Sequence, residues 1–317
     1  MRVTRRPSLD AIREAAERIR EVVVHTPLLK PKGEAGDVLL KPETLQAVGS
    51  FKLRGVFNAV AAMPGERRAR GLSTVSAGNT AQALAWSGRH FGVPARSLMP
   101  ETAPATKIAA VRRLGGTPDL VPVPELFRYL RERGWESEPY AFVHPWTDPD
   151  VMTGHGSLGL EILADCPELD SVFAAVGGGG LIAGLASALK ASKPGVRVFG
   201  VEPEGCASLR ASFDAGHPAA VDCHTLSDGV AVPYITEEMY PLLRELVDDV
   251  VCVSEQETRA AIRRLALEEK LVVEGAGALS LAAALRVPRE RRGRSVCVLT
   301  GGSIDADKLA GILASPA

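Results

Sequence analysis

The stretch SVFAAVGGGGLIAGLASALK, residues 171–190, decides the fold of this chain. Its apolar run over 171–176 predicts a buried strand, and the apolar and small residues that follow the glycines predict a helix up to about residue 190. Four consecutive glycines, Gly177 to Gly180, join the two. Because glycine has no Cβ, backbone N–H groups in such a turn can approach an anion closely at the helix N-terminus. The stretch therefore predicts a phosphate site at a strand-to-helix turn.

Alternatives to a phosphate site at the glycine run are weaker. A dinucleotide-binding turn stays possible, because Glu202 follows at a tolerable distance, although the GxGxxG pattern fits only loosely. A Walker phosphate loop is excluded, because no Gly-Lys-Ser/Thr sequence follows. We do not expect ordinary packing to explain four glycines, since they cost conformational entropy and bring no side chains.

Working outward, short apolar runs alternate with helical segments over most of the chain. Strands are predicted at 38–43, 72–76, 95–100, 119–123, 171–176, 196–202 and 294–300. Helices are predicted at 8–20, 51–63, 80–91, 105–114, after 123 to about 133, in the second half of 171–190, and at 254–270. Ser8 and Ser254 are the expected N-caps of the first and last. This alternation predicts an α/β fold with largely parallel sheets, and the length of 317 residues favours two domains.

The composition excludes several classes of partner. A hydrophobic content of 46% is enough for a sizeable core, and the net charge of -1 favours neither nucleic acid nor an acidic membrane surface. No apolar run approaches the ~18 residues that span a bilayer, and no secretory signal follows the basic N-terminus. The cysteines are scattered without CxxC spacing, which predicts reduced thiols in a cytoplasmic protein. They are Cys166, Cys206, Cys223, Cys252 and Cys297.

A single lysine stands out in GSFKLRGVFNAV, residues 49–60. Lys52 follows a Gly-Ser turn, lies next to Phe51 and starts a predicted helix. Burial and a helix N-terminus both lower the pKa of a lysine, and a neutral amine can attack an aldehyde. Taken alone, the position fits a solvated lysine in a first helical turn better.

Two further loops end predicted strands. STVSAGNTAQALAW, residues 73–86, puts a turn of small residues before a helix, which suits a bound carboxylate, and Asn79 could donate its amide to a ring oxygen. RSVCVLTGGSID, residues 294–305, ends its strand at Thr300, and a hydroxyl there suits a neutral pyridine nitrogen. Ordinary strand-to-helix turns explain each loop about as well on its own.

The segments SFKLRG, SAGNTAQA, VGGGGLIAG and LTGGS occur in this one order. In this combination the chain resembles the fold type II pyridoxal-phosphate enzymes, within them the serine/threonine dehydratase and serine racemase group, from roughly Thr26 to Asp305. The resemblance implies a tryptophan synthase β-like fold of two domains, each a mostly parallel twisted sheet flanked by helices. Residues 1–67 and 149–317 would form the large domain that binds pyridoxal 5'-phosphate, and residues 68–148 the small domain.

The resemblance also implies roles for single residues. Lys52 would form the Schiff base and move the Cα proton, and Phe51 would pack near the ring. Asn79 would bond the phenolic oxygen and Thr300 would face the pyridine nitrogen. The cofactor phosphate would be held by Gly177, Gly178, Gly179 and Gly180, and it would be the proton donor to the leaving hydroxyl. The substrate carboxylate would be bound by Ser76, Gly78, Asn79 and Thr80.

No metal ligand is assigned. Some relatives bind a divalent cation near the segment that reads VEPEGCAS here. Glu202 matches a ligand position, but Ser208 stands where an Asp is expected. A divalent cation such as Mg²⁺ or Ca²⁺ is therefore possible without being predicted.

The implied reaction is elimination of the β-hydroxyl from a small amino acid such as L-serine or L-threonine, giving a 2-oxo acid and ammonia. Ala77 stands where a racemase would carry a second acid–base serine, so racemisation is disfavoured. Thr80 replaces the usual histidine of dehydratases and matches β-replacement enzymes, which leaves that reaction open. His155 replaces a frequent glutamine, a second change that could alter specificity. A non-catalytic protein that binds a phosphate ligand is the alternative from a different class, and a homodimer is expected by analogy.

Overall fold

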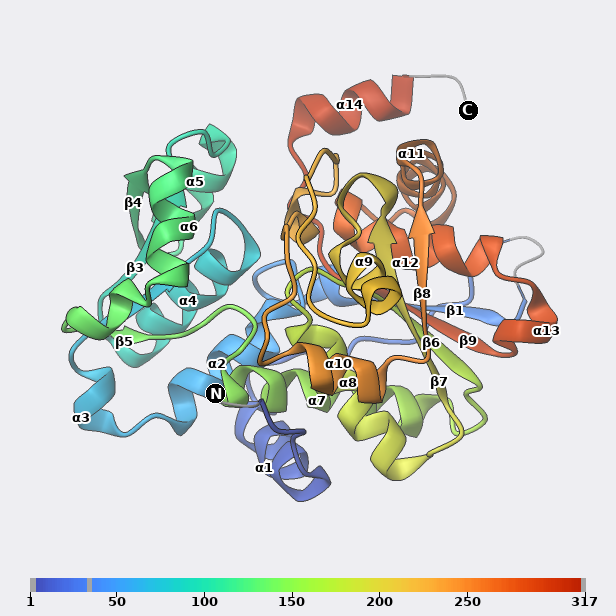
Figure 1. The fold of residues 1–317 in the computed structure, drawn as a ribbon, viewed down its shortest axis with the longest axis horizontal. Coiled ribbons are helices and arrows are strands. Elements are labelled where there is room, and N and C mark those ends of the chain that lie inside the picture. Colours follow the sequence, from blue (N-terminus) through green and yellow to red (C-terminus); the bar gives the residue numbers. More distant parts are fainter. Residues whose placement is uncertain (1–3, 33–35, 315–317) are drawn as a thin grey trace.

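The computed structural model describes residues 4–32 and 36–314, and it contains two parallel sheets (Figure 1). The larger sheet has the strand order β1 (Val38–Pro42), β9 (Ser295–Leu299), β6 (Ser171–Ala175), β7 (Arg197–Pro203), β8 (Asp249–Val253). The smaller has the order β4 (Thr117–Val121), β3 (Ala95–Pro100), β2 (Leu72–Val75), β5 (Ala141–Phe142). Every strand pair in both sheets is parallel, so the predicted α/β class is confirmed.

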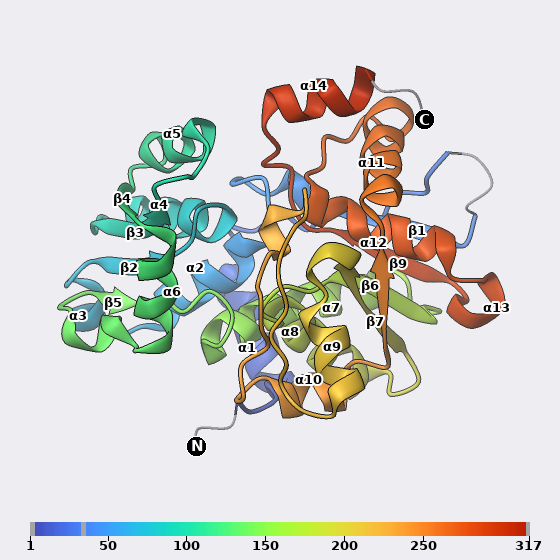
Figure 2. The same ribbon diagram turned by 45° about the horizontal axis from the view of Figure 1, so that its top comes forward.

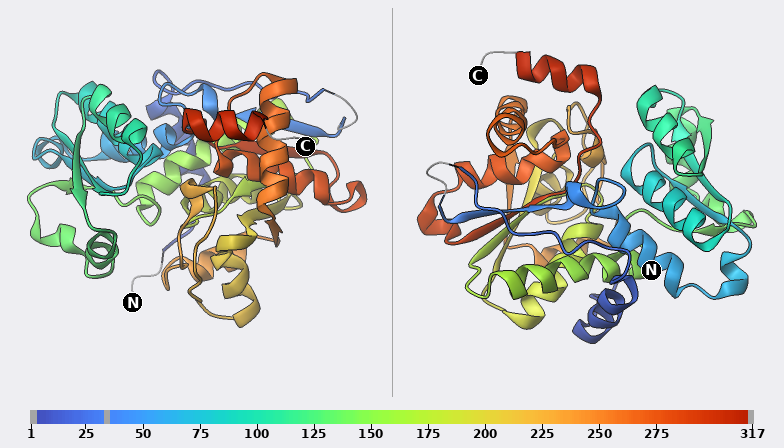
Figure 3. Two further views of the ribbon diagram at one scale, coloured as in Figure 1. Left: turned by 90° about the horizontal axis from the view of Figure 1, so that it is seen from above. Right: turned by 180° about the vertical axis from the view of Figure 1, so that it is seen from behind.

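Helices flank both sheets. Their bounds are α1 (Leu9–Ile19), α2 (Lys52–Ala62), α3 (Gly65–Arg68), α4 (Asn79–Phe91), α5 (Ala105–Arg113), α6 (Val123–Arg131), α7 (Pro149–Asp165), α8 (Gly180–Ser192), α9 (Ser208–Ala215), α10 (Tyr240–Leu246), α11 (Glu255–Arg264), α12 (Gly275–Arg286), α13 (Arg289–Arg292) and α14 (Ala306–Ala314). Figures 2 and 3 show the smaller sheet and helices α4 to α6 as a body of their own beside the larger one.

Strand β6 explains the unbroken apolar run over residues 172–176. Val172 and Ala174 belong to the core cluster on the side of α7, α8 and α10, whereas Phe173 and Ala175 belong to the cluster on the side of α11 and α12. Successive side chains of a strand point to opposite faces. Both faces of this central strand are therefore buried, as is usual when helices cover both sides of a parallel sheet.

The predicted elements agree with the structure with a few shifts. Ser8 and Ser254 are N-caps, and the oxygen of each side chain accepts a backbone N–H of the first helical turn. The strand predicted at 119–123 lies at Thr117–Val121 instead, because Pro122 starts α6. The helix predicted at 254–270 is α-helical only to Arg264 and continues as a π-helical turn, Leu265–Glu269.

A buried ion network fixes helix α2 in the large body. Arg54 and Glu43 are fully buried, and the guanidinium of Arg54 donates to Glu43 at 2.7 Å and to Glu161 of α7 at 2.7 Å. Lys41, also fully buried, contacts Glu161 at 2.8 Å. Since Arg54 follows Lys52 by two residues, the network holds the first turn of α2 against α7.

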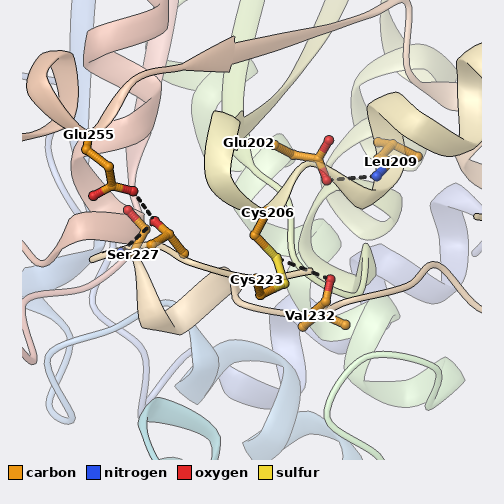
Figure 4. Close-up of a disulfide and its surroundings, with 8 residues drawn as sticks. Glu202, Cys206, Leu209, Cys223, Ser227, Val232 and Glu255 are labelled. Atoms are coloured by element: carbon orange, nitrogen blue, oxygen red, sulfur yellow. Dashed lines mark hydrogen bonds between the residues drawn. A yellow bond between two sulfur atoms is a disulfide. The ribbon is translucent and has the colours of Figure 1, made fainter. Parts of the chain in front are cut away.

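The expectation of reduced thiols is wrong for two cysteines. Cys206 and Cys223 form a disulfide, 17 residues apart in sequence (Figure 4). The N–H of His224 donates to the carbonyl of Gly205 at 2.8 Å, so the segments next to Cys223 and Cys206 lie side by side. A Cβ at Gly205 would lie 2.1 Å from the carbonyl oxygen of His224, so this approach requires glycine there. CxxC spacing could not reveal the pair, because non-local contacts bring the two cysteines together.

Candidate active site

A pocket of about 460 Å³ is lined by residues of both bodies. Its walls include the loop between β2 and α4, the turn between β6 and α8, and the residue that follows β9. In open parallel sheets, ligands bind outside the carboxyl ends of the strands, and these turns lie at such ends. All the site residues predicted from the sequence line this pocket: Phe51, Lys52, Ser76, Gly78, Asn79, Thr80, Gly177, Gly178, Gly179, Gly180 and Thr300.

Lys52 is the first residue of α2, and its surroundings favour a neutral amine. Its Nζ donates to the carbonyl of Pro145 at 3.2 Å and lies 5.0 Å from the centre of the Phe51 ring. Desolvation lowers the pKa of Lys52 to about 8, although the charge of Glu274 acts in the opposite direction. At neutral to mildly alkaline pH, a substantial share of this lysine is therefore available as a nucleophile or base.

The backbone connects Lys52 to the end of β9. The N–H of Phe51 donates to the carbonyl of Thr300 at 3.0 Å, and Ser50 forms a bridge with Gly301. The hydroxyl of Thr300 makes no hydrogen bond with any described residue, although the residue is only 4% exposed. It is thus a free donor and acceptor at the pocket wall.

The glycine run packs closely, which corrects the expectation that packing would not explain it. A Cβ on Gly178 would lie 2.3 Å from the indole ring of Trp146, and one on Gly179 would lie 2.6 Å from Leu243. Gly179 also has a positive φ of 89° as the N-cap of α8. The run is therefore needed for packing, and it also leaves the free N–H groups of the first turn of α8 open to an anion.

Asn79, the first residue of α4, contacts a residue that the sequence analysis missed. Its Nδ2 donates at 2.7 Å to Oε1 of Glu274, which precedes α12 and lines the pocket. Its Oδ1 is buried without a hydrogen-bond partner among the described residues. Glu274 is an acid between Val273 and a Gly-Ala-Gly-Ala run, and a lone charge in such apolar surroundings was the signal available in the sequence.

The part of the loop that was predicted to bind substrate is arranged around Ser76. The Oγ of Ser76 accepts the N–H of Gly78 at 3.1 Å, and Thr80 is buried in the first turn of α4. Ala77 also lines the pocket and carries no group that can transfer a proton. Loop N–H groups and the N-terminus of α4 suit a carboxylate here.

His155 does not line the pocket. It is fully buried behind Phe51, with the two ring centres 4.7 Å apart, and neither ring nitrogen has a partner among the described residues. Burial lowers the pKa of His155 well below its usual value, so the ring is neutral. A Cβ on Gly55 would lie 2.4 Å from this ring, so His155 acts by packing beneath α2.

Glu202 caps a helix. Its Oε1 accepts the N–H of Leu209 at 2.8 Å, drawn in Figure 4, and its Oε2 accepts the N–H of Arg210 at 2.9 Å. Burial raises the pKa of Glu202 to about 7. Within residues 4–32 and 36–314, no cluster of three or more His, Cys, Asp or Glu side chains could hold a metal ion.

Comparison with known proteins places this architecture. A family model described as "Pyridoxal-phosphate dependent enzyme" matches residues 19–301. An L-threonine ammonia-lyase of Thermotoga maritima is 38% identical over 310 residues, which cover 95% of this chain and 77% of the relative. The processed form of threonine deaminase isoform 2 from Solanum lycopersicum has a TM-score of 0.87 and 32% identity, covering 99% of this chain and 97% of that chain. A maize serine racemase has a TM-score of 0.90 and 31% identity, covering 97% of both.

None of the described helices combines the length and the apolar character that crossing a membrane requires.

Proposed function

The chain belongs to the family of pyridoxal-phosphate dependent enzymes, and we propose that it is an ammonia-lyase acting on a small β-hydroxy amino acid. It removes the β-hydroxyl of a substrate such as L-threonine or L-serine and releases a 2-oxo acid and ammonia. One observation carries this proposal: a single pocket contains a lysine of lowered pKa, a turn without Cβ atoms at a helix N-terminus, and the asparagine loop.

The residues present fit the cofactor. Lys52 would hold its aldehyde, and Gly177 to Gly180 with the first turn of α8 would hold its phosphate. The Nδ2 of Asn79 has a second N–H beside the one donated to Glu274, which fits the ring oxygen, and the hydroxyl of Thr300, without a partner among the described residues, fits the ring nitrogen. When bound, the cofactor supplies an electron sink that makes the hydrogen on the substrate Cα removable as a proton.

The chain's own residues supply the remaining chemistry. The neutral amine of Lys52 accepts the proton from the substrate Cα. The loop of Ser76, Gly78, Asn79 and Thr80 binds the substrate carboxylate and so fixes which bond faces Lys52. Since Ala77 cannot return a proton from the other side, elimination is favoured over racemisation.

The experiment that tests the proposal is a keto-acid release assay with the purified holoenzyme. L-serine, L-threonine, their D-forms and bulkier β-hydroxy amino acids would be compared, with Lys52→Ala as the inactive variant. Keto acid from at least one L-substrate is expected, together with a visible absorption band that borohydride abolishes. The assignment fails if no substrate yields keto acid while an added thiol yields a substituted amino acid.

We also propose the domain division that the resemblance implies, with residues 68–148 as the small domain. Sheet membership supports it, because all four strands of the smaller sheet fall between Leu72 and Phe142. Limited proteolysis is the test: cuts are expected first near residues 67 and 149, and first cuts inside either body would contradict the division.

A homodimer and a cytoplasmic location are further proposals of the resemblance. The dimer rests on family analogy and is tested by sedimentation of the holoenzyme. The cytoplasmic location is no longer supported by the cysteines, because a disulfide is unusual in that compartment. A divalent cation is not proposed, because it would have to compete for Glu202 with two backbone N–H groups.

A further inference from the structure

One carboxyl group of the pocket, Glu274, has no part in the function proposed above. It is 4% exposed and lies directly before α12, where its backbone N–H donates to the carbonyl of Gly301 at 3.0 Å. A Cβ on Gly301 would come within 2.7 Å of Oε1 of Glu274, so glycine at 301 leaves room for the carboxyl. The group is thus fixed at the end of β9, beside the segment that carries Lys52.

The two oxygens of Glu274 differ in their surroundings. Oε1 accepts the amide of Asn79 at 2.7 Å. Oε2 accepts no hydrogen bond from any described residue. It is also not one of the completely buried atoms that lack a partner, so it is accessible. Because Glu274 lines the pocket, its free oxygen opens on the same space as the amine of Lys52.

The surroundings of Glu274 allow it to hold a proton. Burial raises the pKa of Glu274 above its usual value, and the charge of Asp228 acts in the same direction. Lys107 and Lys52 face the carboxyl and favour its ionised form, but burial outweighs them. Lys107 is itself paired with Asp228, which offsets part of its charge.

Elimination of a hydroxyl group needs an acid, because hydroxide is a poor leaving group. The resemblance implies the cofactor phosphate as this acid, whereas among the chain's own groups in the pocket those other than Glu274 are less suited to the task. Lys107 is engaged with Asp228, and the hydroxyl of Ser76 is a much weaker acid than a carboxyl. Among the described residues, two carboxyl groups line the pocket with Lys52: Asp228 and Glu274. Asp228 is held in an ion pair with Lys107, whereas Glu274 has an oxygen, Oε2, without a hydrogen-bond partner.

We propose that Glu274 is a catalytic acid, whose Oε2 gives the proton that the β-hydroxyl takes as it leaves. The proposal rests on the elimination reaction proposed above. Lys52 takes the Cα proton, the Cβ–O bond breaks, and the oxygen keeps that electron pair and takes the Glu274 proton to leave as water. Lys52 is then an ammonium and Glu274 a carboxylate, so transfer of one proton from Lys52 to Glu274 resets both.

The test compares two leaving groups in the holoenzyme of Glu274→Gln. Glutamine keeps an oxygen that can accept the Asn79 amide but has no transferable proton. Serine must lose its hydroxyl with a proton, whereas β-chloroalanine loses chloride without one. We expect kcat for serine to fall by about 10² to 10⁴-fold, the usual loss for a general acid, with little change for β-chloroalanine. Glu245→Gln is the matched control, since it makes the same replacement at an exposed carboxyl outside the pocket, paired with Arg6, and should leave both rates unchanged.

Two further measurements do not depend on turnover. The absorption spectrum and affinity of the bound cofactor should match between Glu274→Gln and the wild type. The infrared difference between the two holoenzymes should contain the C=O stretch of a protonated carboxyl. If Glu274→Gln does not fold, Glu274→Asp replaces it. The aspartate side chain is one methylene shorter, so its carboxyl lies farther from the substrate, and kcat should fall more for serine than for β-chloroalanine.

Three results would overturn the proposal. Equal losses with both substrates would mean that Glu274 only orients Asn79 or tunes the charge of the pocket. Undiminished serine turnover would mean that the proton comes from elsewhere, such as the cofactor phosphate, and a missing infrared band would mean that Glu274 holds no proton. If the wild type releases keto acid from neither substrate, the elimination function fails first, and the variants are not needed to see it.

Discussion

At the scale of single residues, the amine of Lys52 has the most direct consequence. Desolvation lowers its pKa to about 8 from a usual value of 10.5, so the neutral fraction grows as the pH rises towards 8. Only the neutral amine can attack the cofactor's aldehyde. The pH at which the apoenzyme captures its cofactor is therefore determined largely by burial of this side chain.

We predict that cofactor capture by the apoenzyme accelerates about tenfold per pH unit below pH 8 and levels off above it. The measurement is the growth of the visible band after mixing, followed by stopped flow over a range of pH. Lys190→Ala removes a lysine outside the pocket that is paired with Asp248, and it is the control, with an unchanged profile. A plateau reached only near pH 10 would contradict the lowered pKa.

The glycine run gives a second prediction at this scale. A Cβ on Gly178 would meet the Trp146 ring at 2.3 Å, whereas nothing lies within 4 Å of one on Gly195. Gly178→Ala should therefore lower the free energy of unfolding by about 1 to 3 kcal/mol, the usual cost of overpacking, and weaken cofactor binding. Gly195→Ala should do neither. Chemical denaturation and cofactor titration measure both effects, and similar behaviour of the two variants would contradict the close packing.

The residues of the pocket were predictable to different degrees. The glycine run stands out by itself, whereas Lys52, Asn79 and Thr300 were found through the order of their segments, which resembles a known family. Glu274 was not found, because its importance comes from Asn79, a residue 195 positions away. No local pattern in a single sequence encodes such a contact.

At the scale of elements, helix α2 depends on a buried ion network. Arg54 is fully buried between Glu43 and Glu161, and the loss of one member of such a network leaves charges without a partner. The network orients the first turn of α2 and hence Lys52. Its effect on stability should be much larger than that of an exposed pair.

We predict that Arg54→Ala lowers the free energy of unfolding by about 3 to 5 kcal/mol. Arg13→Ala, which breaks an exposed pair with Asp10, should change it by less than about 1 kcal/mol. Urea denaturation of both variants provides the comparison. Equal, small effects would show that the Arg54 network is not needed to hold α2.

The disulfide gives the second prediction for an element. It closes a loop between η3 (Glu204–Cys206) and the segment that leads to Asp228–Val230, which lines the pocket. A crosslink of this span stabilises a fold by about 3 kcal/mol, mainly through the unfolded chain. Cys223→Ser should remove that contribution, whereas Cys252→Ser, which changes a free thiol, should not. Equal unfolding energies for wild type and Cys223→Ser would contradict a contribution from the disulfide.

Element by element, the sequence predicted seven of the strands in the described residues and missed β5 and β8 (Asp249–Val253), the latter despite its run of apolar residues. Strand β5 has two residues, too few for any periodic signal. Helix α12 was missed because its small and apolar residues are buried all round, so it has no polar face to reveal its period.

At the scale of the whole molecule, alternation of strands and helices was enough to predict largely parallel sheets, but not the order of their strands. The order of the larger sheet places β1 beside β9, the first and last strands of the chain. Pairing between such distant segments is determined by packing of the complete chain. Contacts across the two bodies, such as Asn79 with Glu274, could not be predicted for the same reason.

The fold of the molecule should not depend on a divalent cation. Both oxygens of Glu202 accept backbone N–H groups, and Ser208 offers no carboxylate. We expect EDTA to leave the melting temperature and the turnover of the holoenzyme unchanged, because a ligand stabilises a protein only if it binds the folded state. Calorimetry with and without EDTA is the measurement, and a fall in melting temperature that Mg²⁺ or Ca²⁺ reverses would contradict this.

The pairing of β1 with β9 also bears on how the protein is made. Phe51, next to the lysine, is bonded to Thr300, so the first and last parts of the catalytic pocket are synthesised about 250 residues apart. For most of translation, the growing chain contains Lys52 but not yet Thr300 and the rest of the last strand, which complete the pocket. Vitamin B6 can therefore be taken up in a productive orientation only once the chain is almost finished, which makes the loading of the coenzyme a late step of biosynthesis.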